Sequence, residues 1–143
     1  MRNQSTTTTE TQGGAPGSGS PLGHCKLVAF VATCDASRAK AFYRDTLGLR
    51  LVSEDGFALV FDVSGTTLRV PVVQHLAPAP YTVLGWEVAD VAATGQALRA
   101  AGVALERYPG MQQDDLGVWT SPGGGQVAWF KDPDGNTLSV SQH

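Results

Sequence analysis

The sequence predicts an α+β protein made of two successive βαβββ modules. Two observations support this fold class. The order strand, helix, three strands occurs twice, over about residues 24–75 and 80–143. The fragment 65–70, Gly-Thr-Thr-Leu-Arg-Val, also aligns with 135–140, Gly-Asn-Thr-Leu-Ser-Val, matching at the Gly, the second Thr, the Leu and the Val. The length of 143 residues predicts one domain rather than two, with a body after the N-terminal tail that is large enough for one core.

Composition excludes several classes of protein. Of the 143 residues, 42% are hydrophobic and 16% are charged, which is typical of a soluble globular domain. No run approaches the roughly 18 apolar residues of a membrane span, and no secretory signal opens the chain, so we expect a cytoplasmic protein. The formal net charge is -3 and Lys and Arg do not cluster, so nucleic acid is not an expected partner. Residues 1–23 are rich in Ser, Thr and Gly and are predicted to be a disordered tail before the domain at 24–143.

The first module begins with an apolar strand at 26–32. Asp35 then stands at an N-cap position, followed by a helix that runs through Arg44 and ends at Gly48. Asp-Gly and Ser-Gly pairs are typical of hairpin turns. They separate three further predicted strands, at 49–54, 57–63 and 67–73.

The second module repeats this order with a longer loop. A strand at 82–88 precedes the cap residue Asp90, a helix through Ala101 and the terminating Gly102. The extra length comes from an insertion between Glu106 and Gln126. The remaining extended segments are predicted at 103–107, 118–120, 126–130 and 137–140. Cys25 and Cys34 flank the first strand, which holds them too far apart for a disulfide, so free thiols are expected.

Two further motifs indicate a family. The first helix ends in Phe-Tyr-Arg-Asp-Thr-Leu-Gly-Leu at 42–49, and the second module closes with Phe-Lys-Asp-Pro-Asp-Gly-Asn at 130–136. Together with the duplication, these motifs resemble the vicinal oxygen chelate superfamily, which includes glyoxalase I, bleomycin-resistance proteins, fosfomycin-resistance enzymes and extradiol dioxygenases. The resemblance covers the chain after the tail. It implies curved mixed sheets with helices on their outer faces, a concave ligand cavity, and a homodimer in which a second copy completes that cavity.

The resemblance also indicates where a metal would bind. Metal-dependent members place His or Glu ligands on the first and last strand of each module. The corresponding residues here are Val28, Arg69, Val83 and Ser139. None supplies a carboxylate or an imidazole, and His24, His75 and His143 lie elsewhere. We therefore expect neither a metal nor another cofactor.

Strand alternation predicts the residues that line the cavity. Arg69 could hold an anionic group of a ligand, or could pair with Glu87 or a backbone carbonyl. Glu87 could act as a general base, although a solvated or paired carboxylate is the simpler interpretation. Trp86 is predicted to lie in the core, whereas alternation leaves open whether Trp129 or Phe130 faces the cavity. The candidate ligand-binding residues are Val28, Phe30, Arg69, Val83, Glu87, Met111, Trp119 and Ser139.

The favoured function is metal-independent binding of a small organic molecule in a largely apolar cavity, for instance to sequester an antibiotic or a metabolite. The first alternative is a metal-independent isomerase or lyase in which Arg69 holds an anionic substrate. The second is a metal-dependent glyoxalase or dioxygenase. The missing metal ligands favour a binding protein over an enzyme, and the sequence identifies no catalytic residue.

Overall fold

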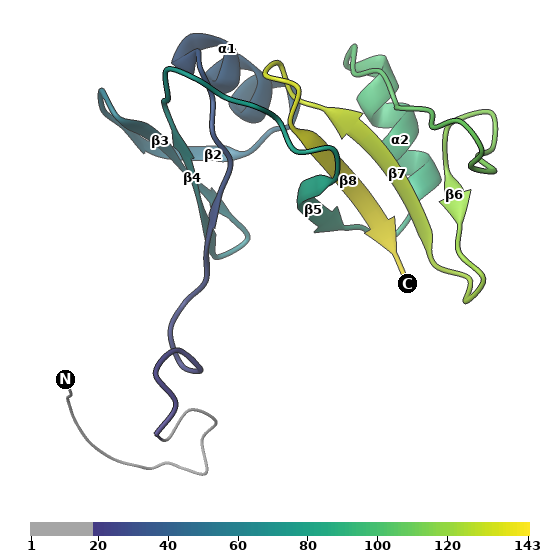
Figure 1. Cartoon of the computed structure of the whole chain (residues 1–143), viewed down its shortest axis with the longest axis horizontal. Helices are drawn as coiled ribbons and strands as arrows, with labels where there is room; N and C mark the ends of the chain where they lie inside the picture. Colours follow the sequence, from purple (N-terminus) through teal and green to yellow (C-terminus); the bar gives the residue numbers. More distant parts are fainter. Residues whose placement is uncertain (1–18) are drawn as a thin grey trace.

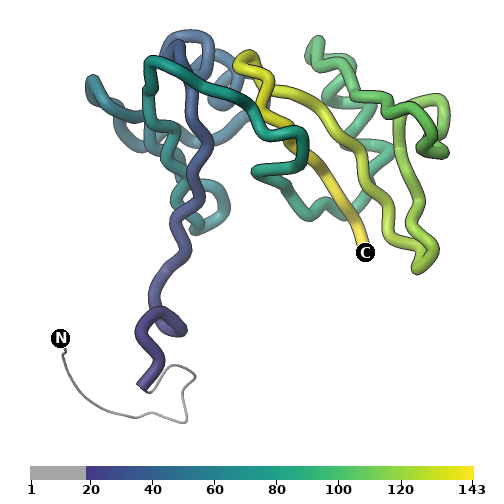
Figure 2. Tube along the Cα trace, viewed as in Figure 1, coloured from purple at the N-terminus to yellow at the C-terminus, as the bar shows by residue number. Residues whose placement is uncertain are grey.

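Two four-stranded mixed sheets form the body of the molecule in a computed structural model that describes residues 19–143 (Figure 1). The strand orders are β1-β4-β3-β2 and β5-β8-β7-β6, so both modules have the same topology. This confirms the predicted α+β fold and its duplication. Most of the predicted tail lies outside the described residues, and the chain from residue 19 to β1 extends away from the sheets (Figure 2).

The N-terminal module contains β1 to β4. Its strand β1 runs parallel to β4, whereas β2, β3 and β4 are antiparallel neighbours. Its elements are β1 (Val28–Phe30), α1 (Ala36–Lys40), η1 (Ala41–Thr46), β2 (Arg50–Glu54), β3 (Ala58–Val63) and β4 (Thr66–Pro71).

The C-terminal module contains β5 to β8. Strand β5 is parallel to β8, and β6, β7 and β8 are antiparallel neighbours. The segment predicted as extended at 103–107 forms only one bridge, between Leu105 and Phe130. The elements are β5 (Thr82–Glu87), α2 (Val91–Ala100), β6 (Trp119–Thr120), β7 (Gln126–Lys131) and β8 (Thr137–Gln142).

The helix caps confirm the predicted starts and ends of both helices. Asp35 and Asp90 have nearly equal backbone angles, φ -146°, ψ 101° and φ -147°, ψ 102°. Each carboxylate accepts a hydrogen bond of 3.1 Å from a backbone N–H of the first turn. Gly48 and Gly102 follow the helices with φ of 78° and 90°, where a side chain would be strained.

The first helix differs from the prediction in its second half. A regular α-helix through Arg44 was expected, but from Ala41 to Thr46 the chain forms the π-helix η1. In this wider turn the N–H of Leu47 donates to the carbonyl of Phe42 at 2.9 Å. Phe42 and Tyr43, although adjacent in sequence, both pack against the core, with their rings 5.1 Å apart at 90°.

The core lies between each sheet and its helix. Along β4, Leu68 and Val70 are buried whereas Arg69 between them is exposed, as strand alternation requires. Trp86, which was predicted to lie in the core, is half-buried and packs against the core residue Phe130 with ring centroids 6.4 Å apart. We call the face of each sheet that turns away from its helix the open face.

The turn between β7 and β8 connects the modules. The Asp132 carboxylate is buried and accepts hydrogen bonds from the Tyr43 hydroxyl (2.6 Å) and from the Asn136 side-chain amide (2.8 Å). Asn136 also donates to the carbonyl of Ala32, and the Asp134 carboxylate accepts from the Thr33 hydroxyl and the Cys34 amide. We call these residues the junction network; the turn that carries it lies beside α1 in Figure 2.

Among residues 19–143, no helix is long and apolar enough to cross a membrane. Cys25 and Cys34 are both free thiols, as the sequence analysis predicted, and both are exposed.

Candidate functional site

The predicted ligand-binding residues fall into two groups, one on each open face. Register places Val28, Phe30 and Arg69 on the open face of the N-terminal module. The open face of the C-terminal module carries the second group, which is Glu87, Trp119 and Ser139. Val83 lies at the register shift between Thr82 and Leu84 of β5, where the pairing does not assign it to a face. Met111 lies half-buried in the loop before β6. A site that uses both groups therefore needs two sheets to face each other.

Trp129 resolves the choice that the sequence left open. It pairs with Ser139 across β7 and β8 and lies on the open face, whereas Phe130 is 1% exposed in the core. The Trp129 indole N–H donates to the Thr82 hydroxyl at 3.1 Å, which directs the ring across β8, the strand between β7 and β5. Aligning Phe130 with Phe61, its buried counterpart in the first module, would have given this orientation from the sequence.

Three aromatic rings gather on this open face. The Trp119 and Trp129 centroids are 6.3 Å apart, and Tyr108 meets Trp129 edge to face at 5.5 Å and 84°. We call Tyr108, Trp119 and Trp129 the aromatic surface. Flat rings of this kind offer a large apolar contact area to a planar molecule.

Hydrogen bonds within the insertion hold Tyr108 in place. The Gln113 side chain accepts from the backbone N–H of Tyr108 at 2.8 Å and donates to the carbonyls of Glu106 and Gly117. The Asp114 carboxylate accepts from three successive backbone amides, those of residues 116–118. Burial, and then the Glu106 carboxylate, raise the pKa of Tyr108, so its hydroxyl stays neutral and able to donate.

Arg69 is the charged residue at the centre of the other open face. It is exposed and forms no ion pair within residues 19–143. Glu87, one of the partners that the sequence allowed, belongs to the other sheet, and no ion pair joins the two within residues 19–143. On the same face, Arg50 is neutralised by Asp62 at 3.2 Å, which leaves Arg69 available for a ligand or a facing protein surface.

The residues at the family's metal positions do not fit a metal ion. Val28 and Val83 have no donor atom, Arg69 is a cation, and Ser139 offers only a hydroxyl. Across residues 19–143, no group of three or more His, Cys, Asp and Glu side chains converges. We therefore derive no chemistry from a metal.

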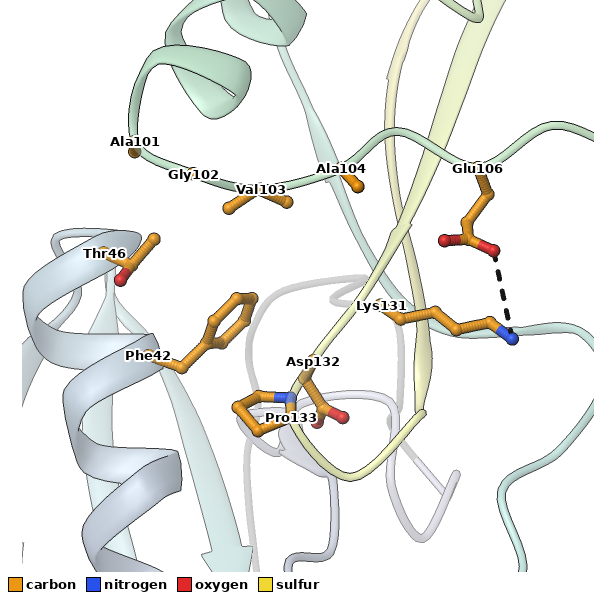
Figure 3. A pocket seen from close by; sticks show the side chains of 10 residues that line it. All are labelled: Phe42, Thr46, Ala101, Gly102, Val103, Ala104, Glu106, Lys131, Asp132 and Pro133. Atoms are coloured by element: carbon orange, nitrogen blue, oxygen red, sulfur yellow. Dashed lines mark ion pairs between the residues drawn. The ribbon is translucent and has the colours of Figure 1, made fainter.

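A groove of about 320 Å³ lies between the modules on the helix side (Figure 3). Phe42 points into it from η1, and its ring lies between Val103 on one side and Pro133 on the other. Its charged groups are already paired, because Lys131 faces Glu106 at 4.0 Å and Asp132 belongs to the junction network. None of the predicted ligand-binding residues lines it, and the aromatic surface is the stronger candidate site.

The fold places the protein in a class that includes both enzymes and binding proteins. The chain belongs to the Glyoxalase/Bleomycin resistance protein/Dioxygenase superfamily, whose family model matches residues 22–140. No protein of curated function matches its sequence.

Solved structures share the fold at low sequence identity. A lactoylglutathione lyase from Agrobacterium tumefaciens is 19% identical, with a TM-score of 0.66 over 83% of this chain and 93% of that one. A putative glyoxalase family protein from Bacillus anthracis is 17% identical, with a TM-score of 0.65 over 96% and 99%. A glyoxalase-related enzyme from Fulvimarina pelagi is 21% identical, with a TM-score of 0.64 over 84% and 88%. At these identities the likeness shows the fold alone.

Proposed function

We propose that this protein binds a small planar organic molecule against its aromatic surface, without a metal. The observation that carries the proposal is the orientation of Trp129, which lies on the open face beside Trp119 and Tyr108. Ligand sites are mostly apolar surfaces with a few polar groups, and the neighbouring Thr82 and Ser139 hydroxyls supply such groups.

We further propose that a second copy of the chain covers the ligand. Apolar side chains are exposed together on the open face of the N-terminal module, where Phe30 is 59% and Val28 40% exposed. Clustered apolar exposure of this kind marks an interface more often than isolated exposed residues do. Covering this face with the aromatic surface of a second copy would enclose a cavity between two sheets.

Calorimetric titration tests the binding site. The probe is 2-naphthamide, a flat neutral molecule, and the variants are Trp129→Leu and the matched control Trp86→Phe, which alters a tryptophan packed against the core. We expect wild type and the control to bind saturably and Trp129→Leu to bind at least tenfold more weakly. If neither 2-naphthamide nor its acid, 2-naphthoate, binds the wild type at millimolar concentration, the proposed function is wrong.

Two further measurements test the other parts of the proposal. Titration after EDTA treatment and again with added Zn²⁺ or Ni²⁺ should give the same affinity, and stoichiometric metal in the purified protein would contradict metal independence. Sedimentation should show a dimer that Phe30→Asp converts to a folded monomer. A wild-type monomer at micromolar concentration would rule out the second copy.

The exposed, unpaired Arg69 favours one alternative function, a metal-independent isomerase or lyase acting on an anionic substrate. Turnover assays over carboxylated and phosphorylated metabolites distinguish the two functions. Turnover that Arg69→Ala abolishes while binding is only weakened would establish the enzyme. Absence of turnover across the panel, together with saturable binding of 2-naphthamide, supports the binding protein.

A further inference from the structure

Ser139 carries a buried hydroxyl with no hydrogen-bond partner among residues 19–143. The residue is 8% exposed, on β8, with its side chain on the open face between Gly85 of β5 and Trp129 of β7. Its neighbour Thr82 uses its hydroxyl to accept from Trp129, but the Ser139 hydroxyl receives nothing comparable. Buried polar groups are normally paired, and an unpaired one in a native protein calls for a physical explanation.

Gly85 leaves open the space beside this hydroxyl. A β-carbon at Gly85 would lie 2.8 Å from Ser139 Oγ, closer than a carbon can approach without displacing it. The hydroxyl therefore occupies a niche that any other residue at position 85 would fill. A ligand ring stacked on Trp129 would bring a polar substituent at its edge next to this niche, because Trp129 and Ser139 are direct cross-strand neighbours.

Arg69 occupies the position in the N-terminal module that Ser139 occupies in the C-terminal one. Phe30 pairs with Arg69 in the same way that Gly85 pairs with Ser139, and both pairs stand at the same distance from their helix caps and hairpin glycines. If the open faces of two such modules meet about a pseudo-twofold axis that passes near β4 and β8, these equivalent positions approach each other. The unpaired guanidinium would then face a surface that holds the Ser139 hydroxyl and, two residues beyond Gly85 on β5, the Glu87 carboxylate.

We propose that the ligand is a planar aromatic acid. This inference rests on the proposed function and adds the chemical class of the ligand. The ring stacks on Trp129 and contacts Trp119, whose plane is inclined by 40° to that of Trp129. The carboxylate accepts a hydrogen bond from Ser139 of one copy and forms an ion pair with Arg69 of the other. A planar carboxylate matches both donors, because it can accept a bidentate guanidinium and a hydroxyl at once.

The first test compares 2-naphthoate with 2-naphthamide, two flat molecules of nearly equal shape that differ in charge. We expect wild type to prefer the acid by about tenfold or more, the range of a charge-assisted hydrogen bond. Arg69→Gln should bring the ratio close to one, and Arg69→Lys should retain part of it. Ser139→Ala should weaken both probes about fivefold or more, whereas Ser141→Ala, on the same strand and face, should weaken neither.

The second test locates Arg69 relative to the aromatic surface. A heterodimer with one Arg69→Gln chain and one Trp129→Leu chain, purified through two different tags, contains one intact composite site and one doubly altered site. We expect it to bind 2-naphthoate with wild-type affinity at half the wild-type stoichiometry. If the heterodimer binds no 2-naphthoate with wild-type affinity, Arg69 does not act from the second copy.

The outcomes separate this inference from the function on which it rests. Equal affinity for naphthoate and naphthamide in wild type and in Arg69→Gln would overturn the aromatic acid and leave a neutral planar ligand. Binding of neither probe would overturn both proposals. A loss of stability without a change in the affinity ratio in Arg69→Gln would mean that Arg69 pairs with a protein carboxylate such as Glu87.

Discussion

In the N-terminal module, β1 and β4 bring Phe30 beside Arg69, whereas the equivalent strands β5 and β8 bring Gly85 beside Ser139. On the third strand, Val60 pairs with Arg69 where Trp129 pairs with Ser139. The N-terminal open face therefore projects a large apolar ring and a cation, and the C-terminal one offers a niche beside flat aromatic rings. The two modules share one strand topology but carry different side chains on their open faces.

The hairpin turns differ in the same way. In the first module, Ser64 and Gly65 form a tight turn with φ of 49° and 90°. In the second module, the turn extends from Asp132 to Asn136 and supplies the junction network. One turn closes a hairpin, and the other also connects the two modules.

The largest expected effect tests which residues of β7 belong to the core. Phe130→Ala should lower the free energy of unfolding by about 3–5 kcal/mol, because it leaves a cavity among buried side chains. Trp129→Ala, one residue away on the open face, should cost only about 1 kcal/mol. Urea unfolding measures both, and equal losses would contradict the alternation on which the site depends.

The junction network is tested next. Asp132→Ala removes the acceptor for the Tyr43 hydroxyl, the Asn136 side chain and two backbone amides, and should cost about 3 kcal/mol. The matched control is Asp62→Ala, which removes a partly exposed pair with Arg50 and should cost at most about 1 kcal/mol. Similar losses in urea unfolding would mean that the junction is no stronger than a surface ion pair.

A smaller effect tests the niche. Gly85→Ala places a carbon against Ser139 Oγ and should cost about 1–3 kcal/mol through overpacking. Because Ser139→Ala removes that oxygen, the double variant should recover most of the loss. Thermal unfolding of the two single variants and the double variant gives the coupling, and additive losses would show that the two residues do not compete for the same space.

The last prediction concerns pH. Burial, and then the Asp132 carboxylate, raise the pKa of Tyr43 far above its ordinary value. The unfolded chain releases the tyrosine proton near pH 10 while the folded chain keeps it, so stability should fall above about pH 10 by up to ~1.4 kcal/mol per pH unit. Tyr43→Phe, which should cost about 1 kcal/mol at pH 7, should show a shallower decline. An unchanged slope in urea unfolding at pH 9 to 11 would contradict this assignment.

Local signals were sufficient to predict most of the fold. Both helices begin at an Asp and are followed by a Gly, and these residues act on neighbouring backbone atoms. Their position in the sequence was therefore enough to predict where each helix begins and ends. The junction network did not appear in the sequence analysis, because Tyr43 and Asp132 are far apart along the chain and no periodicity relates them. The π-helix η1 was also missed, since the apolar spacing of Phe42 and Tyr43 fits a regular α-helix equally well.

The site was predicted in part. Alternation placed Arg69 and Ser139 on the open faces, but the direction of Trp129 required a strand register that the sequence analysis did not fix. Tyr108 joins the aromatic surface through the Gln113 contacts of an irregular loop, and no repeating pattern describes such a loop.

The parallel edge strands β1 and β5 affect how the chain folds. Each hairpin, β3–β4 or β7–β8, pairs residues close in sequence, whereas β1 must pair Val28 with Thr67 and β5 must pair Gly85 with Ser139 across much longer loops. Closing a long loop costs entropy before any contact forms, so we expect the edge strands to dock after the hairpins. Substitutions in the hairpins should therefore slow folding, and those in β1 and β5 should mainly speed unfolding.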